Sequence, residues 1–446
     1  MPGPPTDSAG PGHLLAIAMV AAATFGCSKS NTTHSDAALS ASDATPDATT
    51  TMSDASADAS ARNDDARTGI GGGLPCDASD QCITGACTLG VCIDWQHAMR
   101  VRIDTTEAGA DVTGTVTDFP LLVRLGGDTN AFDFSQARID GGDIRFVDNK
   151  GHNLNYQIER WDNQRQLAEL WVSVPQIVGN SAANTILLYW GNEFAGPVAS
   201  GTAVFDSYSC VYHIEDTLAA PPGTTKQVQD DSGHNYVGSI DSPASDSSAS
   251  AITHADGVIG YGVALNGKSN FLTTPSIPQG PQSLSISLWF NAQLDAPGGL
   301  AAFYRPGPGT SDGSTNHAIT MNPDGTLSFS VLHQSARAAV TSLTSYDDNT
   351  WHFVTARLSA SGQYLFVDGE SVAEDPTLTS ADSSQDSVWR FGQLPGVTAA
   401  GIPSAYFAGV LDEIRVSGNE ESADWIKLAY ATQRPRSSAV TYVPAE

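Results

Sequence analysis

The chain has 446 residues, enough for two or three domains that each bury a core. It carries 49 acidic against 21 basic residues, a formal net charge of -28. This charge argues against nucleic acid and against an anionic membrane surface as partners, whereas cations, neutral glycans and proteins are compatible with it. Glycine and proline are plentiful and lysine is scarce, a composition that favours an all-β, exported chain.

The first segment indicates export. An apolar run from Leu14 to about Thr24 has the length of a signal peptide and is too short to span a bilayer. With Cys27 behind it, "HLLAIAMVAAATFGC" resembles the lipobox of bacterial lipoproteins, which implies that Cys27 is lipid-modified and becomes the new N-terminus. Residues 1–27 are therefore predicted to be a lipoprotein signal peptide, with ordinary secretion as the alternative. Ser28 is not the aspartate that marks inner-membrane retention, so the expected location is the outer membrane or the cell surface.

Residues 28–73 follow as a stretch rich in Ser, Thr, Ala and Asp, with almost no large apolar side chains. Such a segment cannot bury enough surface to offset its chain entropy, so we expect a disordered tether.

Four of the six cysteines lie within residues 74–96, at Cys76, Cys82, Cys87 and Cys92. In an exported chain this even, closely spaced set predicts a small disulfide module, whereas a zinc site would usually show tight C-x-x-C pairs. Three connectivities are possible, and the glycine turns favour Cys76 with Cys87 and Cys82 with Cys92. Cys210 stands alone in an apolar strand and is predicted to be a small buried hydrophobe.

Residues 97–206 show one β-strand after another. In "NLNYQIERW" Leu154, Tyr156 and Ile158 alternate with Asn155, Gln157 and Glu159, which predicts a strand with one buried and one solvent face. "QLAELWVSVP" alternates in the same way, and "NTILLYWGN" suits a central strand. In order, "DFPLLVRL", "FDFSQARIDGGDIRFVDNKGHNLNYQIERWD", "LWVSVPQI" and "ILLYWGN" resemble domain-of-unknown-function family 2341. The resemblance implies a β-sandwich of bacterial and archaeal surface proteins without implying an established activity.

Two groups of residues in this region invite a functional interpretation. Four aspartates, at 140, 143, 148 and 162, could suggest a metal site, but capping of turns explains them better. Three tryptophans, at 161, 171 and 190, could stack on sugar rings, but their strand positions favour packing in the core or between domains.

Residues 207–418 continue with antiparallel strands, and the pairs Asp324-Gly325 and Asp368-Gly369 predict hairpin turns. Many strands over some two hundred residues indicate one large sandwich or jelly roll. "DDSGHNYVGSI", "VALNGKSNFL", "SLSISLWF", "WHFVTARL", "YLFVDGESV" and "GVLDEIRVS" resemble the concanavalin A-like, laminin-G type of jelly roll. That resemblance implies binding of carbohydrate or protein, often with calcium, and some relatives of the wider fold are glycoside hydrolases.

The hydrolase alternative fails a test of spacing. On this fold, laminarinase-like enzymes carry their carboxylates as E-x-D-x-E or E-x-D-x-x-E, because alternate strand residues share a face. No glutamate of this chain is followed two positions later by aspartate. The histidines at 213, 317, 333 and 352 also lack the spacing of metal ligands and are expected to be packed or surface residues. We therefore expect no enzymatic activity.

Strict alternation along "VLDEIRV" would place its two acids on opposite faces of the strand. Glu413 would share the solvent face with Arg415 and pair with it, while Asp412 would lie on the apolar face with Ile414. A buried carboxylate must be hydrogen-bonded, paired or bound to a metal. The resemblance allows a calcium site at Asp412, with Asp230 and Asp231 as candidate partners, and a purely hydrogen-bonded structural aspartate is the alternative.

In residues 419–446 the spacing of apolar residues changes from the two-residue period of strands to that of a helix. Ser422 can cap a helix that ends near Gln433 and packs across both sandwiches, and "SADWIKLAY" resembles the terminal segment of proteins that pair these two families. The predicted fold is all-β, with two antiparallel sandwiches, a short disulfide module and a C-terminal helix. The predicted function is binding of a glycan or a surface protein by a lipid-anchored protein. Adhesion without glycan specificity and a glycoside hydrolase are the alternatives.

Overall fold

A computed structural model describes residues 87–88, 91–92, 95–127, 130, 132–192, 195–214, 225–241, 253–307, 313–395 and 406–444. Cys27, the tether, Cys76 and Cys82 lie outside the described residues, so the lipid anchor and the disulfide pairing stay predictions. The first two strands, β1 (Cys87–Thr88) and β2 (Val91–Cys92), form an antiparallel pair whose backbone register places Cys87 opposite Cys92.

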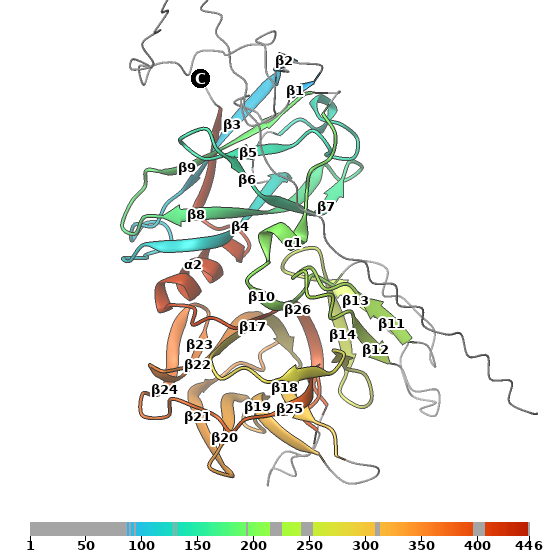
Figure 1. The fold of residues 1–446 in the computed structure, drawn as a ribbon, viewed down its shortest axis with the longest axis vertical. Coiled ribbons are helices and arrows are strands. Elements are labelled where there is room, and N and C mark those ends of the chain that lie inside the picture. Colours follow the sequence, from blue (N-terminus) through green and yellow to red (C-terminus); the bar gives the residue numbers. More distant parts are fainter. Residues whose placement is uncertain are drawn as a thin grey trace, which may run out of the picture. The chain divides into compact units, whose positions relative to one another are not determined.

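The first sandwich consists of two antiparallel sheets (Figure 1). In the described residues, one sheet has the order β27 (Val440–Pro444), β3 (His97–Ile103), β9 (Asn184–Trp190), β5 (Arg145–Val147) and β6 (Asn153–Leu154). The other has the order β4 (Val116–Gly126), β8 (Leu167–Ile177) and β7 (Tyr156–Asp162). Two short helices accompany them, η2 (Phe134–Gln136) and α1 (Gly201–Val204).

The apolar side chains predicted for the inner face of these strands are buried. Leu154, Tyr156, Leu170 and Val172 belong to one core, and β9 is a central strand between β3 and β5 as its apolar run predicts. The candidate turn aspartates do cap turns. Asp148, for example, accepts hydrogen bonds from the backbone N–H groups of Lys150 (2.8 Å) and His152 (2.9 Å). The same holds for the aspartates at 140, 143 and 162, which accept from backbone N–H groups nearby.

The jelly roll has two larger antiparallel sheets. In the described residues, the first has the order β13 (Thr253–Asp256), β14 (Tyr261–Asn266), β26 (Ala408–Ser417), β17 (Leu284–Ala292), β22 (Trp351–Ser359), β23 (Gly362–Val367) and β24 (Glu370–Asp375), with β10 (Tyr208–Tyr212) also paired to β26. The second has the order β11 (Thr225–Val228), β12 (Gly238–Asp241), β15 (Leu272–Thr273), β25 (Gln385–Phe391), β18 (Gly298–Arg305), β19 (Ser314–Met321), β20 (Thr326–His333) and β21 (Ala336–Ser345), with β16 (Ile277–Gln279) also paired to β25.

Both predicted hairpin turns are present in the jelly roll. Asp368 and Gly369 have φ values of 53° and 84°, the left-handed conformation that the two-residue turn between β23 and β24 requires. Gly325 lies between β19 and β20 with a φ of 76°. Cys210 is fully buried in the core between the sheets, as its apolar surroundings predict.

The C-terminal helix α2 (Ala423–Gln433) contacts both sandwiches. The hydroxyl of Ser422 caps it by accepting a hydrogen bond from the backbone N–H of Trp425 (3.0 Å). The ring of Trp425 packs edge-on against Phe119 of the first sandwich, with 5.2 Å between the ring centroids. At the other end of the helix, the indole of Trp289 in the jelly roll donates a hydrogen bond to Gln433 (2.8 Å). The prediction that this helix packs across both sandwiches is confirmed.

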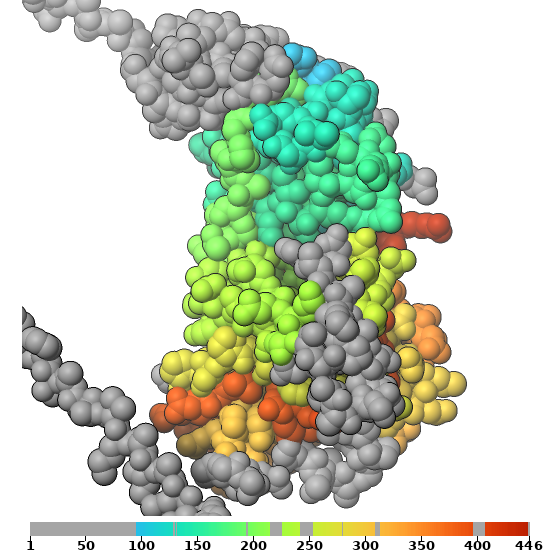
Figure 2. Space-filling model, turned by 90° about the vertical axis from the view of Figure 1, so that its right-hand side faces the viewer, coloured from blue at the N-terminus to red at the C-terminus, as the bar shows by residue number. Residues whose placement is uncertain are grey.

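After the helix, the chain returns to the first sandwich, which the sequence analysis does not predict. Strand β27 pairs along β3, so the last described residues complete a sheet that begins near residue 97 (Figure 1). Jelly-roll side chains such as Trp289 and Phe353 also belong to the first sandwich's core cluster. Figure 2 shows this continuity on one face, where green residues of the first sandwich border yellow-green residues of the jelly roll. No helix in the described part of the chain is long and apolar enough to cross a membrane.

Candidate functional site

Asp412 lies where the two sandwiches meet, fully buried. Its Oδ2 accepts hydrogen bonds from the backbone N–H groups of Val258 (2.8 Å) and Ile259 (3.1 Å). Burial, reinforced by the neighbouring Glu413 carboxylate, raises the pKa of Asp412 well above its usual range. These contacts are the kind that a hydrogen-bonded structural aspartate requires, and calcium binding at Asp412 stays a prediction.

The two proposed calcium partners of Asp412 lie in a separate turn. Asp230 accepts hydrogen bonds from the backbone N–H groups of Val211 (3.0 Å), Ser232 (3.0 Å) and Tyr236 (2.8 Å) and so organises that turn. The neighbouring Asp231 points elsewhere, with its Oδ2 lying 3.9 Å from Nε2 of His213. Burial raises the pKa of Asp231. Among the described residues, the three aspartates do not gather into one ligand group.

A β-bulge changes which face of β26 each acid occupies. Where β17 advances two residues, from Ser287 to Trp289, its partner β26 spans three, from Arg415 to Asp412. Glu413 and Ile414 therefore lie opposite a single residue of β17. Glu413 has a φ of 51°, the left-handed conformation that non-glycine residues rarely adopt. Asp412 pairs with Trp289, and Arg415 pairs with Ser287, so both side chains lie on the face toward the first sandwich.

The solvent position predicted for Glu413 is therefore wrong. The prediction assumed strict alternation, which would place Asp412 with Ile414 and Glu413 on the opposite face. In the structure Ile414 and Leu411 lie in the jelly-roll core, whereas Asp412 and Glu413 share the inter-sandwich side. Glu413 is only 1% exposed because the first sandwich covers this face.

The Glu413 carboxylate is held by the guanidinium of Arg415 and the imidazole of His213. Its Oε2 accepts a hydrogen bond from the guanidinium of Arg415, which confirms the predicted pair, and its Oε1 lies 2.8 Å from Nδ1 of His213. The Arg415 guanidinium also lies 4.0 Å from the centre of the Trp171 ring. Burial by itself would raise the pKa of Glu413, but His213 and Arg415 outweigh it and lower the pKa below its usual range.

Glu159, from β7 of the first sandwich, completes the buried group. The indole of Trp171 donates a hydrogen bond to its Oε2 (2.6 Å), and Nδ1 of His213 lies 3.4 Å from the same oxygen. Burial, followed by the charges of Glu413 and Glu169, raises the pKa of Glu159 well above its usual range. The prediction that Glu159 faces solvent is wrong, because the jelly roll covers that face of β7.

A second set of ion pairs surrounds this group. Glu169 lies 3.5 Å from Nε of Arg124 and 3.6 Å from Nη1 of Arg160, and it accepts a hydrogen bond from the backbone N–H of Gly260 (2.8 Å). Arg124 also donates to the carbonyl of Gln433 (2.7 Å) at the end of α2. These ion pairs lie within the first sandwich, and the N–H of Gly260 and the carbonyl of Gln433 connect them to the segments that pack against it. We call Glu159, Glu169, His213, Asp412, Glu413, Arg124, Arg160 and Arg415 the interface cluster.

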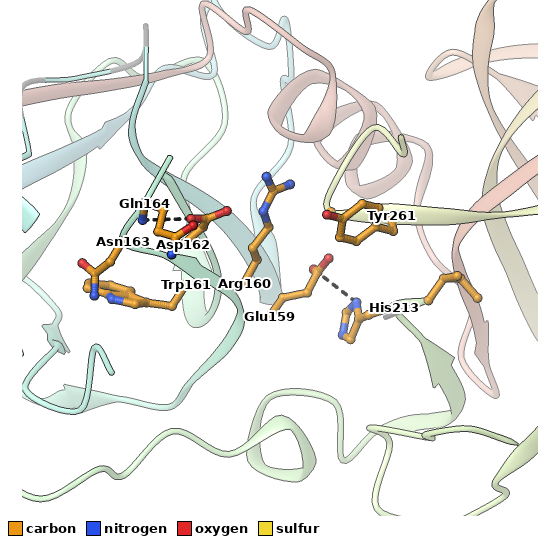
Figure 3. Close-up of a pocket in the computed structure, with 10 residues that line it drawn as sticks. Glu159, Arg160, Trp161, Asp162, Asn163, Gln164, His213 and Tyr261 are labelled. Atoms are coloured by element: carbon orange, nitrogen blue, oxygen red, sulfur yellow. Dashed lines mark hydrogen bonds and ion pairs between the residues drawn. The ribbon is translucent and has the colours of Figure 1, made fainter. Parts of the chain in front are cut away.

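A pocket of about 490 Å³ opens beside the interface cluster (Figure 3). Trp161 and Tyr261 line it together with amide and charged side chains; the Trp161 ring packs on Phe134 at 5.0 Å between centroids, and Arg160 lies over the Tyr261 ring at 5.6 Å. Figure 3 shows Glu159 between Arg160 and His213, with its carboxylate directed toward the histidine. The pocket is lined by Glu159, Arg160, Trp161, Asp162, Asn163, Gln164, His213, Ile214, Gly260 and Tyr261.

Sequence reasoning misses this site because its members lie far apart in the chain. Glu159 and Glu413 belong to different sandwiches, and His213 follows a strand that pairs with β26. Strict alternation would place Glu159 and Trp161 on one face of β7, but a register shift between Ile158 and Arg160 separates them. Trp161 packs on Phe132 and Phe134 of the first core, as predicted, whereas Glu159 turns toward Trp171. The other predicted packing residues, Trp171 and Trp190, are buried as expected.

The chain was compared with curated proteins and with solved structures. No curated protein matches the chain. Among solved structures, domain 4 of an extracellular arabinanase from Geobacillus stearothermophilus, in complex with arabinotriose, is 17% identical with a TM-score of 0.37. The match covers 50% of this chain and 98% of that domain. The ligand-binding domain of botulinum neurotoxin serotype D, in complex with N-acetylneuraminic acid, is 13% identical with a TM-score of 0.35. That match covers 52% of each chain.

The family models locate the two domain types along the chain. The model of the domain of unknown function DUF2341 matches residues 140–217, within and just after the first sandwich. The model of the concanavalin A-like lectin/glucanases superfamily matches residues 266–427, which cover most of the jelly roll and the start of α2. Two regions of the chain therefore match the DUF2341 and the concanavalin A-like family models, in the order that the resemblances in its sequence predict.

Proposed function

We propose that the protein is a non-catalytic surface protein that binds a glycan or the glycan of a glycoprotein. The observation that carries this proposal is the pocket beside the interface cluster. Its volume of about 490 Å³ suits one or two sugar rings. Sugar rings present apolar C–H faces that pack on aromatic rings, here the half-buried ring of Tyr261. Their hydroxyl groups need planar polar partners, which Asn163 and Gln164 supply.

Three further features support this proposal. The jelly roll matches a superfamily whose description includes lectins. The net charge of -28 favours neutral sugars or cations over anionic polymers. A lipid at Cys27 and the tether behind it would hold the sandwiches at the outer membrane or cell surface, within reach of glycans. We include calcium at Asp412 in the proposal as an ion that could support the jelly roll.

Tyr261→Ala tests the proposal on a glycan array with the full chain, in calcium and in a chelator. We expect the wild type to bind a defined set of glycans and Tyr261→Ala to lose about tenfold or more in affinity, because one wall of the pocket is removed. Tyr304→Ala is the matched control, since Tyr304 is also half-buried with an arginine, Arg390, over its ring at 4.9 Å, and it lies outside the pocket. Silence of the wild type on every glycan in both conditions favours the adhesion alternative.

One observation favours a hydrolase as the second candidate. Glu159 and Glu413 have ligating oxygens within 4.8 Å of each other, and their environments shift their pKa values in opposite directions, as in an acid and nucleophile pair. Glu413, however, is fully buried and does not line the pocket, so a substrate in the pocket does not reach it. A reducing-sugar release assay on mixed polysaccharides tests this candidate, with Glu159→Gln as the variant that would abolish any release.

A further inference from the structure

Three potential metal ligands from distant parts of the chain converge at the interface. Glu159, His213 and Glu413 each offer one ligand atom, and these atoms all lie within 4.8 Å of one another. Within the described residues they form the one such group of three. We propose that Glu159, His213 and Glu413 bind a divalent transition-metal ion of the Zn²⁺ class, which joins the first sandwich to the jelly roll.

The distances between the ligand atoms suit a small ion. Nδ1 of His213 lies 2.8 Å from Oε1 of Glu413 and 3.4 Å from Oε2 of Glu159. Nitrogen and oxygen ligands that share a Zn²⁺ ion at about 2.0–2.1 Å lie roughly 3 to 3.5 Å apart. The 3.4 Å distance to Glu159 lies in this range, and the 2.8 Å distance to Glu413 is a hydrogen bond that would lengthen by a few tenths of an ångström when an ion replaces its proton.

His213 is oriented as metal-bound histidines are. With Nδ1 facing the two carboxylates, its other nitrogen, Nε2, points toward Asp231, whose Oδ2 lies 3.9 Å away. A histidine ligand usually directs its second ring nitrogen to a carboxylate or carbonyl, which fixes the tautomer and leaves the first nitrogen free for the metal. The ring is also held in place by Trp171, stacked on it at 5.9 Å between centroids with an interplanar angle of 22°.

Unsatisfied atoms provide an independent reason for an additional ligand. Among the described residues, Oε1 of Glu159 and Nε2 of His213 are buried without a hydrogen-bond partner. The two side chains are only 5% and 2% exposed. Leaving a buried carboxylate oxygen unpaired is costly, and a cation between the carboxylates would offset this cost at Glu159 and the repulsion between Glu159 and Glu413, whereas Nε2 of His213 faces Asp231 instead. The remaining carboxylate contacts, from Trp171 to Glu159 and from Arg415 to Glu413, would then hold the ligands in position.

The donor set selects the kind of ion. One imidazole nitrogen and two carboxylates suit Zn²⁺ and its neighbours in the transition series, whereas Ca²⁺ and Mg²⁺ prefer sites made only of oxygen. Glu159 and His213 also line the pocket, so ions can reach the site from solvent. This site is separate from the calcium position predicted at Asp412, and it does not depend on glycan binding in the pocket.

The test uses the full chain after treatment with a chelator. Isothermal titration with Zn²⁺, Mn²⁺ and Ca²⁺ and the melting temperature in each ion are measured for the wild type and for Glu159→Gln and His213→Gln. We expect Zn²⁺ to raise the melting temperature of the wild type by a few degrees. When Ca²⁺ is also present, the rise caused by Zn²⁺ should be the same. Both variants should bind Zn²⁺ at least tenfold more weakly at this site. Two variants are used so that a failure of one to fold, read by circular dichroism, leaves the other informative.

Two controls separate this site from other metal binding. His152→Gln removes a histidine that also lies beside a carboxylate, at 3.0 Å from Asp148, but is exposed, so Zn²⁺ affinity should remain at the wild-type value. Co²⁺ absorption identifies any binding by the cysteines of residues 74–96, because thiolate ligands give intense bands that a histidine and carboxylate set does not. Equal Zn²⁺ affinity and equal thermal shift in the wild type, Glu159→Gln and His213→Gln would overturn the proposal.

Discussion

Glu413→Ala is expected to lower the free energy of unfolding by about 3–5 kcal/mol in metal-free protein. The substitution leaves the guanidinium of Arg415, which is 2% exposed, buried without its carboxylate partner, and it removes the neighbour of His213 at the same time. Because the cluster includes side chains of both sandwiches, urea denaturation followed by tryptophan fluorescence and by circular dichroism should show both transitions shifted together.

Asp412→Asn is the matched control for this prediction. Asp412 is the adjacent buried acid of the same bulge, and an asparagine oxygen can accept the same two hydrogen bonds from the backbone N–H groups of Val258 and Ile259. Its cost should stay below about 1 kcal/mol. A double-mutant cycle with Arg415→Met isolates the contribution of the ion pair to Glu413. If Glu413→Ala costs no more than Asp412→Asn, the interface cluster does not stabilise the contact between the sandwiches.

His317 is expected to make the jelly roll sensitive to acid. It lies in β19, 1% exposed beside the rings of Phe303 and Trp389, and among the described residues neither ring nitrogen has a hydrogen-bond partner. Burial, followed by the charge of Arg337, lowers its pKa to about 3. The unfolded chain binds the proton near pH 6.5 and the folded chain only near pH 3. The contribution of neutral His317 to the free energy of unfolding is therefore fully present above pH 6.5 and is lost as the pH falls toward 3.

The size of this effect follows from the two pKa values. About 2 kcal/mol should be lost between pH 7 and pH 5, and on the order of 4 kcal/mol by pH 3. Urea denaturation at pH 7, 6 and 5 measures it as the difference between the wild type and His317→Leu, which cannot take up the proton. His152→Gln, at an exposed ring, should keep the slope of the wild type. Parallel pH profiles of the wild type and His317→Leu would contradict the assignment of a neutral, buried His317.

Much of the architecture follows from the sequence because local patterns specify it. Alternation in "NLNYQIERW" and "QLAELWVSVP" places the core side chains of the first sandwich, and Asp-Gly pairs place the hairpins of the jelly roll. Ser422 specifies the start of α2 through its cap. These signals depend on a few neighbouring residues, so they can be recognised in the sequence without knowing which element packs against the sheet. The same is true of Cys210, whose apolar neighbours are enough to predict its burial.

The candidate site was decided only by the tertiary structure. One inserted residue in β26 brings Asp412 and Glu413 to the same side, and no local pattern in "VLDEIRV" announces that bulge. Glu159 and Glu413 lie 254 positions apart in the chain, yet ligand atoms of the two carboxylates lie within 4.8 Å of each other. Their faces of β7 and β26 look solvent-exposed in each sandwich alone and become buried when the sandwiches pack together. Strict alternation specifies the face of a side chain only where no bulge intervenes, and burial and pKa depend in addition on the neighbour that covers that face.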